Sequence, residues 1–304
     1  MPEVNTVPIV SGFRIHGCED RFFPVLCLAV VSSIVKSLTL KIYMKPVRFL
    51  LIITVLAAFG PSLRASSLPD TSVVRSMTVE GDALVNRFEN ELALRKYLEA
   101  LRNDSSNVEI LWRISRAYID IGEHLPVGTE SEEAKQLETY EIALRYAEKA
   151  VSADHRSSMA YTRRSIANGR IALFRGIWES LSLVKQTKAD IDTALTLDPL
   201  NDVANYILGR IHAKVTEKPR ILRWPLGLGW ANTEDAIKYF EKAISLKPEF
   251  IMYRLDCGRA YVDDDNYEMA RKHLNAIDRI GNKDEDDERF RKEAAELLKE
   301  IREQ

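Results

Sequence analysis

The sequence predicts an all-α protein, a right-handed superhelix of paired antiparallel helices that ends in a capping helix. Three observations predict this fold. Small and large residues recur at fixed helical spacing from Ala93 onward, two of the recurring segments end in Leu-Asp-Pro (197–199) and Leu-Lys-Pro (246–248), and a charged amphipathic segment closes the chain. Hydrophobic residues make up 46% of the 304, enough for a sizeable core, and the 13 Gly and 11 Pro are too few for a loop-rich or collagen-like chain.

The first 65 residues are predicted to stand outside this fold. Residues 44–65 have a cationic start, an apolar core at 49–59 and a small last residue, which is the pattern of a secretory signal peptide. An apolar stretch this short would cover roughly 16 Å as a helix, about half of a membrane's hydrocarbon core. We therefore expect an exported protein, in a bacterial periplasm, with a linker at 66–78 and a repeat domain at 79–304.

Residues 1–43 hold a second apolar run, at 22–35. Two interpretations stay open: an upstream extension assigned by mistake, with Met44 as the true start, or a membrane-inserted hairpin of both runs that anchors the protein without cleavage. Residues 1–65 carry seven of the 43 basic and three of the 45 acidic residues, so the remainder has a formal net charge of −6. Such a domain is not a globally basic nucleic-acid binder, and we expect no nucleic-acid partner.

The repeat is clearest near the carboxyl end. When Ile251 is counted as position 1, Gly258 falls at position 8, Ala270 at position 20 and Leu274 at position 24. Small residues allow two helices to approach closely, and the large residue fills the space between them. Earlier second helices repeat this spacing at Ala236, Phe240, Ala243 and Pro248, at Ile191, Ala194 and Pro199, at Ala143, Ala147 and Ala150, and at Ala93, Tyr97 and Ala100. A period of about 34 residues with this pattern is that of the tetratricopeptide repeat.

We count about four such repeats, preceded by a half or degenerate one. After the last repeat, residues 284–288 are all acidic, and Ala294, Leu297 and Leu298 follow at helical spacing. Acidic residues complement the positive end of a helix dipole, and a polar-backed helix covers the last apolar face of a solenoid. We therefore predict a capping helix at 284–303. The acidic run lacks the D-x-D-x-D-G loop of a calcium site, and no metal is expected.

The order of these elements resembles the regulator of microtubule dynamics family of tetratricopeptide-like proteins, over roughly residues 140–303. The segments that carry the resemblance are Ala143–Val151, Met159–Phe174, Ile207–Arg210, Thr233–Phe240 and Glu293–Leu298. The resemblance implies a helical repeat scaffold and, in some members, membrane contact and phospholipid binding. The apparent signal peptide marks this chain as a bacterial, exported relative, which would not meet tubulin, so the microtubule role of the family's name is not expected here.

No residues with the spacing of a catalytic or metal site stand out. The five histidines are scattered, there is no G-x-S-x-G or H-E-x-x-H, and Cys18, Cys27 and Cys257 show no paired spacing. Cys257 is expected to be a small buried residue. The sequence therefore predicts a binding module or scaffold without enzyme activity, cofactor or metal.

The candidate binding residues lie on the predicted concave face, at positions 5, 9 and 13 of the first helices. They are Trp112, Arg116, Arg170, Tyr206, Arg210, Lys214 and Arg259. Arginine can hold a carboxylate or phosphate through two parallel hydrogen bonds. Asp120 and Asp263 fall on the same face, so two interpretations stay open: the arginines clamp an acidic group of a protein or peptide partner, or they pair with these acids and are structural.

The second candidate is an apolar segment at 220–231, which Pro225, Gly227 and Gly229 prevent from forming a long helix. Its large apolar residues are Leu222, Trp224, Leu226, Leu228 and Trp230. Such a segment must bury itself or meet a partner. We expect it to fold back over the groove; contact with a membrane or a protein is the alternative. A groove closed in this way would suit a phospholipid or fatty acyl ligand, and a lipid carrier is the alternative to a protein-binding scaffold.

Overall fold

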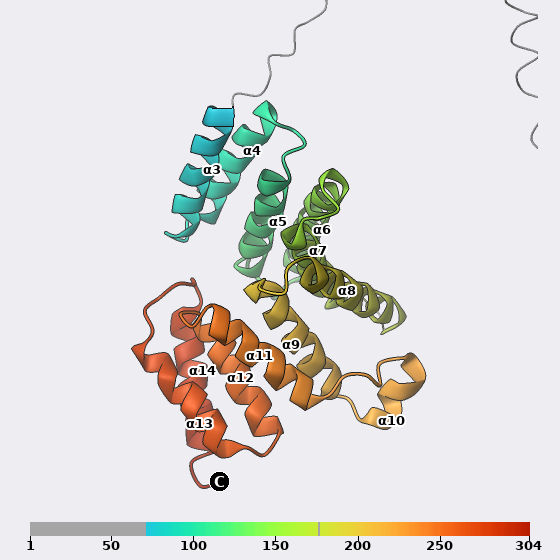
Figure 1. The fold of residues 1–304 in the computed structure, drawn as a ribbon, viewed down its shortest axis with the longest axis vertical. Helices are drawn as coiled ribbons and strands as arrows, with labels where there is room; N and C mark the ends of the chain where they lie inside the picture. Colours follow the sequence, from blue (N-terminus) through green and yellow to red (C-terminus); the bar gives the residue numbers. More distant parts are fainter. Residues whose placement is uncertain (1–70, 176) are drawn as a thin grey trace, which may run out of the picture. The chain divides into compact units, whose positions relative to one another are not determined.

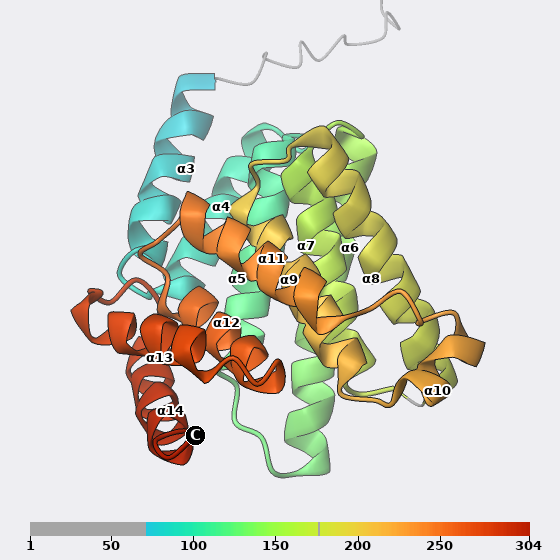
Figure 2. The same cartoon turned by 60° about the horizontal axis from the view of Figure 1, so that its bottom comes forward.

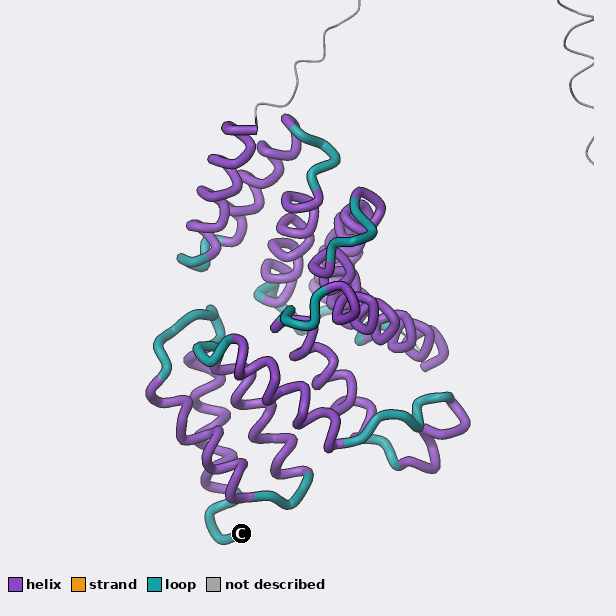
Figure 3. The backbone as a smooth tube through the Cα atoms, viewed as in Figure 1, coloured by secondary structure: helices purple, strands orange, loops and turns teal. Residues whose placement is uncertain are grey.

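The computed structural model describes residues 71–175 and 177–304, which belong to one compact unit. The predicted upstream extension (1–43) and signal peptide (44–65) lie outside the described residues. In the described ranges every regular element is a helix, and the connections between them are loops and turns (Figure 3). None of these helices is long and apolar enough to cross a membrane.

The helices form five successive pairs, each stacked on the next (Figures 1 and 2). The pairs are α3 (Thr71–Val85) with α4 (Asn90–Asn103), α5 (Val108–Glu123) with α6 (Glu130–Ala153), α7 (Ser158–Ala172) with α8 (Ile177–Leu197), α9 (Asp202–Thr216) with α11 (Thr233–Leu246), and α12 (Ile251–Asp263) with α13 (Tyr267–Ala276). Helix α10 (Arg220–Arg223) and the 3-10 turn η1 (Trp224–Leu226) lie between α9 and α11, and the turn η2 (Ile277–Arg279) precedes the last helix, α14 (Asp287–Glu300). The predicted all-α solenoid of tetratricopeptide-like hairpins is confirmed.

Close contact between the two helices of a pair explains the recurring small and large residues. A Cβ atom added at Gly209 of α9 would lie 2.7 Å from the Phe240 ring of α11, and one at Gly258 of α12 would lie 2.8 Å from the Leu274 side chain of α13. These are positions 8 and 24 of their repeats, and Phe240 and Leu274 are each 1% exposed. The small residue is therefore required by the space that the large residue of the partner helix fills.

The amino-terminal repeat is a complete helical pair, not a half repeat. Helix α3 begins at Thr71, within the stretch 66–78 that the sequence analysis assigned to a linker. Its Gly81 packs directly against the Tyr97 ring, in the same small-to-large contact as in the later pairs. This helix was not predicted from the sequence because it buries only Val74, Gly81 and Val85, so few of the repeat's packing positions mark it.

Polar side chains fix where six of the described helices begin. The side chains of Asn107, Ser157, Asn201, Asn232 and Asn266 each accept a hydrogen bond from a backbone N–H in the first turn of the following helix. Thr129 and Glu132 form a reciprocal capping box at the start of α6. The final helix begins at Asp287 and not at 284, because the backbone N–H groups of Lys283 and Asp284 donate to the Asp287 carboxylate at 2.6 and 2.9 Å and hold the preceding acids in a turn.

The loop before α14 returns to the amino-terminal pairs. Asn90 donates to Glu285 at 3.3 Å, and the His124 ring lies 3.6 Å from Glu285 and 3.8 Å from Asp286. Partial burial alone would lower the pKa of His124, but the Asp120 carbonyl and the carboxylates of Glu285 and Asp286 raise it above its ordinary value. The acidic run was predicted to complement the dipole of the last helix. Through Glu285 and Asp286 it also connects the carboxyl-terminal end of the solenoid to the first two helical pairs.

Candidate binding groove

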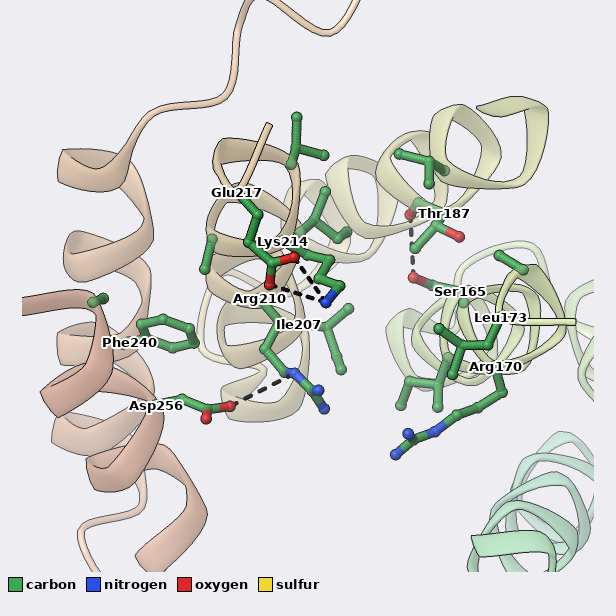
Figure 4. A pocket seen from close by; sticks show the side chains of 18 of the residues that line it. Ser165, Arg170, Leu173, Thr187, Ile207, Arg210, Lys214, Glu217, Phe240 and Asp256 are labelled. Carbon is green, nitrogen blue, oxygen red and sulfur yellow. Dashed lines mark hydrogen bonds and ion pairs between the residues drawn. The ribbon is translucent and has the colours of Figure 1, made fainter. Parts of the chain in front are cut away.

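Two adjoining cavities open on the face lined by the first helices of the pairs. The larger, of about 770 Å³, is lined by residues of α7, α8, α9 and α12 together with Phe240 of α11 (Figure 4). The smaller, of about 330 Å³, is lined by residues from α5, α6, α7, α9, α12 and α14. Arg170, Leu173, Arg210, Asp256 and Arg259 line both. We call the combined space the hollow.

The walls of the larger cavity are mostly apolar, and its charged side chains come from α7, from α9 with its C-cap Glu217, and from α12. The apolar lining comprises Ile166, Ala172, Leu173, Val184, Ile207, Ile211, Ala213, Val215, Phe240 and Ala260. Figure 4 shows the side chains of Arg170, on α7, and Arg210, on α9, directed toward the same open space. The hollow therefore contains five of the seven predicted binding residues. Arg170, Arg210, Lys214 and Arg259 line the larger cavity, and Tyr206 lines the smaller one.

Asp256 is the centre of the polar network in the hollow. Its carboxylate accepts from the Tyr206 hydroxyl at 2.6 Å and from Arg259 at 2.8 Å, and Arg210 Nε lies 3.6 Å away. Burial, with the charge of Asp256, raises the pKa of Tyr206 well above its ordinary value, so the phenol keeps its proton and donates it. Asp256 was not predicted from the sequence, because it falls at position 6 of its repeat, which has no assigned role in packing or in the groove.

The other basic residues of the hollow also have acidic neighbours. Arg170 pairs with Glu123, Lys214 with Glu217 at 2.9 Å, and Arg259 with Glu293 as well as Asp256. Burial raises the pKa of Glu123 although Arg170 acts in the opposite direction. Each predicted cation in the hollow thus has an internal counter-charge, and the hollow is not a strongly positive surface.

Trp112 and Arg116 line neither cavity. Trp112 is 9% exposed, and two guanidinium groups lie near its ring, that of Arg113 at 4.1 Å and that of Arg163 at 5.8 Å from the ring centre. Arg116 pairs with Asp120 at 3.3 Å on its own helix. The pairs turn relative to one another, so equivalent repeat positions on α5 do not reach the space that α7, α9 and α12 enclose.

The apolar segment 220–231 does not fold over the groove as expected, since none of its residues lines either cavity. It projects beyond the end of α9, where Figures 1 and 2 both show α10 at the edge of the molecule. Leu228 and Trp230 pack on the core formed by α8 and α9, and the buried Arg223 donates to the Ala231 carbonyl at 2.7 Å. Leu226 is partly buried. These anchors hold the segment in place and leave Leu222 60% and Trp224 74% exposed.

Comparison with known proteins identifies the family. The family described as Regulator of microtubule dynamics protein 1-3 matches residues 77–302. The chain belongs to this family. Regulator of microtubule dynamics protein 1 of Mus musculus is 27% identical over 241 residues, which cover 77% of this chain and 77% of the mouse protein. Protein 3 of Rattus norvegicus is 28% identical over 206 residues, which cover 63% of this chain and 41% of the rat protein.

A solved structure shows the same fold. A thermophilic tetratricopeptide repeat protein of Thermus thermophilus matches with a TM-score of 0.55 at 15% identity, over 74% of this chain and 98% of that one. The resemblance of the sequence to the regulator of microtubule dynamics family and to tetratricopeptide repeat proteins is therefore confirmed. A fold of this kind suggests a scaffold for protein interactions.

Proposed function

We propose that this member of the family is a non-enzymatic scaffold whose hollow binds an extended segment of a protein partner through an acidic group. The hollow is lined by the first helices of three successive pairs, α7, α9 and α12, so a segment lying across them contacts each in turn. The observation that carries the proposal is that Arg170, Arg210 and Arg259 line both cavities. Any segment that crosses from one cavity to the other meets these three side chains, together with Leu173 and Asp256.

Arg210 is the guanidinium best placed to bind the partner. Its Nε lies 3.6 Å from Asp256, beyond hydrogen-bond range, and its side chain is 45% exposed. Arg259 is equally exposed but donates to Asp256 at 2.8 Å and also contacts Glu293. A partner carboxylate can therefore hydrogen-bond to Arg210 without breaking a short internal bond.

Photocrosslinking in the source cell tests this proposal. A benzoylphenylalanine residue replaces Leu173, which is 68% exposed at the rim of both cavities, or Leu200, which is 62% exposed and lines neither. The same polypeptide should be captured at Leu173 and not at Leu200, and Arg210→Gln should weaken its binding by roughly tenfold to a hundredfold, the loss of a charged hydrogen bond. The proposal is wrong if the polypeptide is captured equally at both positions. It is also wrong if Arg210→Gln lowers stability and leaves binding unchanged.

Two observations favour a lipid or acyl carrier as the second candidate. The larger cavity combines apolar walls with the guanidinium groups of Arg170, Arg210 and Arg259, which suits an acyl chain with an anionic head. The exposed Ile221, Leu222 and Trp224, with Lys218 and Arg220 beside them, form an apolar tip with a basic margin that suits peripheral contact with an anionic membrane.

The carrier has its own tests. Native mass spectrometry of protein from the source cell should detect a retained lipid, and Leu173→Asp, at the cavity rim, should reduce it. Sedimentation with vesicles containing phosphatidylserine should decrease for Trp224→Ser and stay unchanged for Trp230→Phe, which alters a ring packed on the core. If the mass spectrum shows no bound lipid and the protein does not sediment with the vesicles, the carrier function is excluded and the scaffold function remains.

A further inference from the structure

A set of metal-ligating side chains, away from the hollow, is assembled by three successive helices. Glu241 of α11, Cys257 of α12 and His273 of α13 each offer one ligand atom, and these atoms lie within 4.8 Å of one another. Each residue stands sixteen positions after the one before it. No short sequence motif marks them, and the groove proposed above uses none of the three.

The burial of these residues suits a site for an ion. Cys257 is fully buried and His273 is 3% exposed, whereas the side chain of Glu241 is 37% exposed. The thiol and the imidazole are therefore fixed by packing in the core that α11, α12 and α13 share. The carboxylate at the outer side gives an ion a path from solvent.

Hydrogen bonds within the protein leave this cluster incomplete. His273 Nε2 lies 2.9 Å from Glu241 Oε1, and the Tyr261 hydroxyl donates to the same oxygen at 2.9 Å. His273 Nδ1 is buried with no hydrogen-bond partner among the described residues. If Nε2 carries the proton, the Nδ1 lone pair is unmatched; if Nδ1 carries it, that N–H is unmatched and the Nε2 lone pair faces a carboxylate oxygen. Neither neutral tautomer satisfies the ring. Of the two, the tautomer with its proton on Nδ1 places the Nε2 lone pair against the Glu241 carboxylate, a repulsive contact that a cation bound between Nε2 and the carboxylate would relieve.

We propose that Glu241, Cys257 and His273 form a zinc-binding site. A thiolate, an imidazole and a carboxylate together are ligands that zinc prefers, whereas calcium and magnesium take oxygen ligands. Zinc bonds of about 2.0–2.3 Å in a tetrahedron place ligand atoms roughly 3.3–3.8 Å apart, so side-chain shifts of about 1 Å close the present cluster around the ion. On binding, the Cys257 thiol releases its proton to solvent, and the thiolate and carboxylate together balance the charge of the ion.

The fourth position of the tetrahedron falls to the Tyr261 hydroxyl or to a water molecule. Because the ligands come from α11, α12 and α13, the ion joins the last helical pair to the helix before it. A zinc ion held there acts structurally, as a clamp at the carboxyl-terminal end of the solenoid. The site is independent of the hollow and of whatever the hollow binds.

Cobalt and zinc titrations test the proposal on the full-length chain, with Cys18 and Cys27 replaced by serine so that Cys257 is the only thiol. One equivalent of Co²⁺ should produce a thiolate-to-cobalt charge-transfer band, and Zn²⁺ should abolish it. Free zinc at a hundredfold excess over its dissociation constant should raise Tm by about 5–10 °C. Cys257→Ala and Glu241→Gln, which keep much of the packing volume, should each weaken zinc binding at least tenfold.

The matched control is His155→Gln, at an exposed loop position, which should leave zinc binding unchanged. Circular dichroism verifies that each variant keeps its helices. If folded protein gives no charge-transfer band, or if Cys257→Ala and Glu241→Gln bind zinc as tightly as the parent, the proposal is wrong and the cluster is a buried hydrogen-bonded contact between helices.

Discussion

The contact between Gly209 and Phe240 predicts that one substitution has opposite effects at two glycines. Both Gly209 of α9 and Gly169 of α7 lie inside helices. A Cβ at Gly209 would lie 2.7 and 2.8 Å from two carbons of the Phe240 ring and 3.1 Å from the Ala236 carbonyl oxygen, whereas one at Gly169 would meet nothing within 4 Å. We expect Gly209→Ala to destabilise the protein and Gly169→Ala to stabilise it.

The magnitudes follow from two opposing contributions. Alanine in place of glycine favours a helix by up to about 1 kcal/mol at either position. At Gly209 the added methyl must displace a ring that is 1% exposed and approach a carbonyl that cannot rotate, which costs about 2–3 kcal/mol. The net change in the free energy of unfolding is therefore a loss of about 1–2 kcal/mol for Gly209→Ala and a gain of about 0.5–1 kcal/mol for Gly169→Ala.

Thermal unfolding followed by circular dichroism measures both changes. For a domain of this size, Tm should fall by about 2–8 °C for Gly209→Ala and rise by about 1–4 °C for Gly169→Ala. Adding Phe240→Leu to Gly209→Ala should cost less than the sum of the two single changes, because the smaller side chain makes room for the methyl group. If both alanine variants shift Tm in the same direction, the packing described for α9 and α11 is wrong.

Three other changes test the packing and the closing loop. Ala243→Leu, at a fully buried position, should cost about 1–3 kcal/mol of stability in a denaturant titration, and no change would mean that the repeat register is wrong. Arg164→Met removes both hydrogen bonds, at 2.8 and 2.7 Å, that the guanidinium donates to the buried Asp190. A cost of about 3 kcal/mol is expected in the same titration, and unchanged stability would contradict the role of this pair. The raised pKa of His124 means that the stability from its contacts with the acidic loop is fully present below about pH 6.5 and is lost as pH rises through the raised value. The difference in Tm between the parent and His124→Gln should therefore shrink between pH 6 and pH 8.5, and a constant difference would contradict this role. Amino-terminal sequencing of protein isolated from outside the cytoplasm should find Ser66 first, and an intact chain in the cytosol would refute export.

The repeat architecture was predictable because each pair uses the same local geometry. Gly258, Ala270 and Leu274 touch their partners at fixed helical positions, so their spacing in the sequence carries the fold. Helix α3 was not predictable in this way, because it buries only three residues and few of the repeat's packing positions mark it. Residues 284–286 were not predictable either, because the choice between helix and turn depends there on the Asp287 carboxylate binding two backbone N–H groups.

The sequence by itself determined four of the five helical pairs and the type of side chain on the concave face, because these depend on contacts within one repeat. Only the tertiary structure decided which of those side chains share a space. The rotation of each helical pair relative to the next brings Arg170, Arg210 and Arg259 to one hollow and leaves Trp112 and Arg116 outside it. The same stacking sets Glu241, Cys257 and His273 side by side. Side chains from different repeats meet according to the angles between helical pairs, and those angles depend on packing over the whole interface, which no local spacing records.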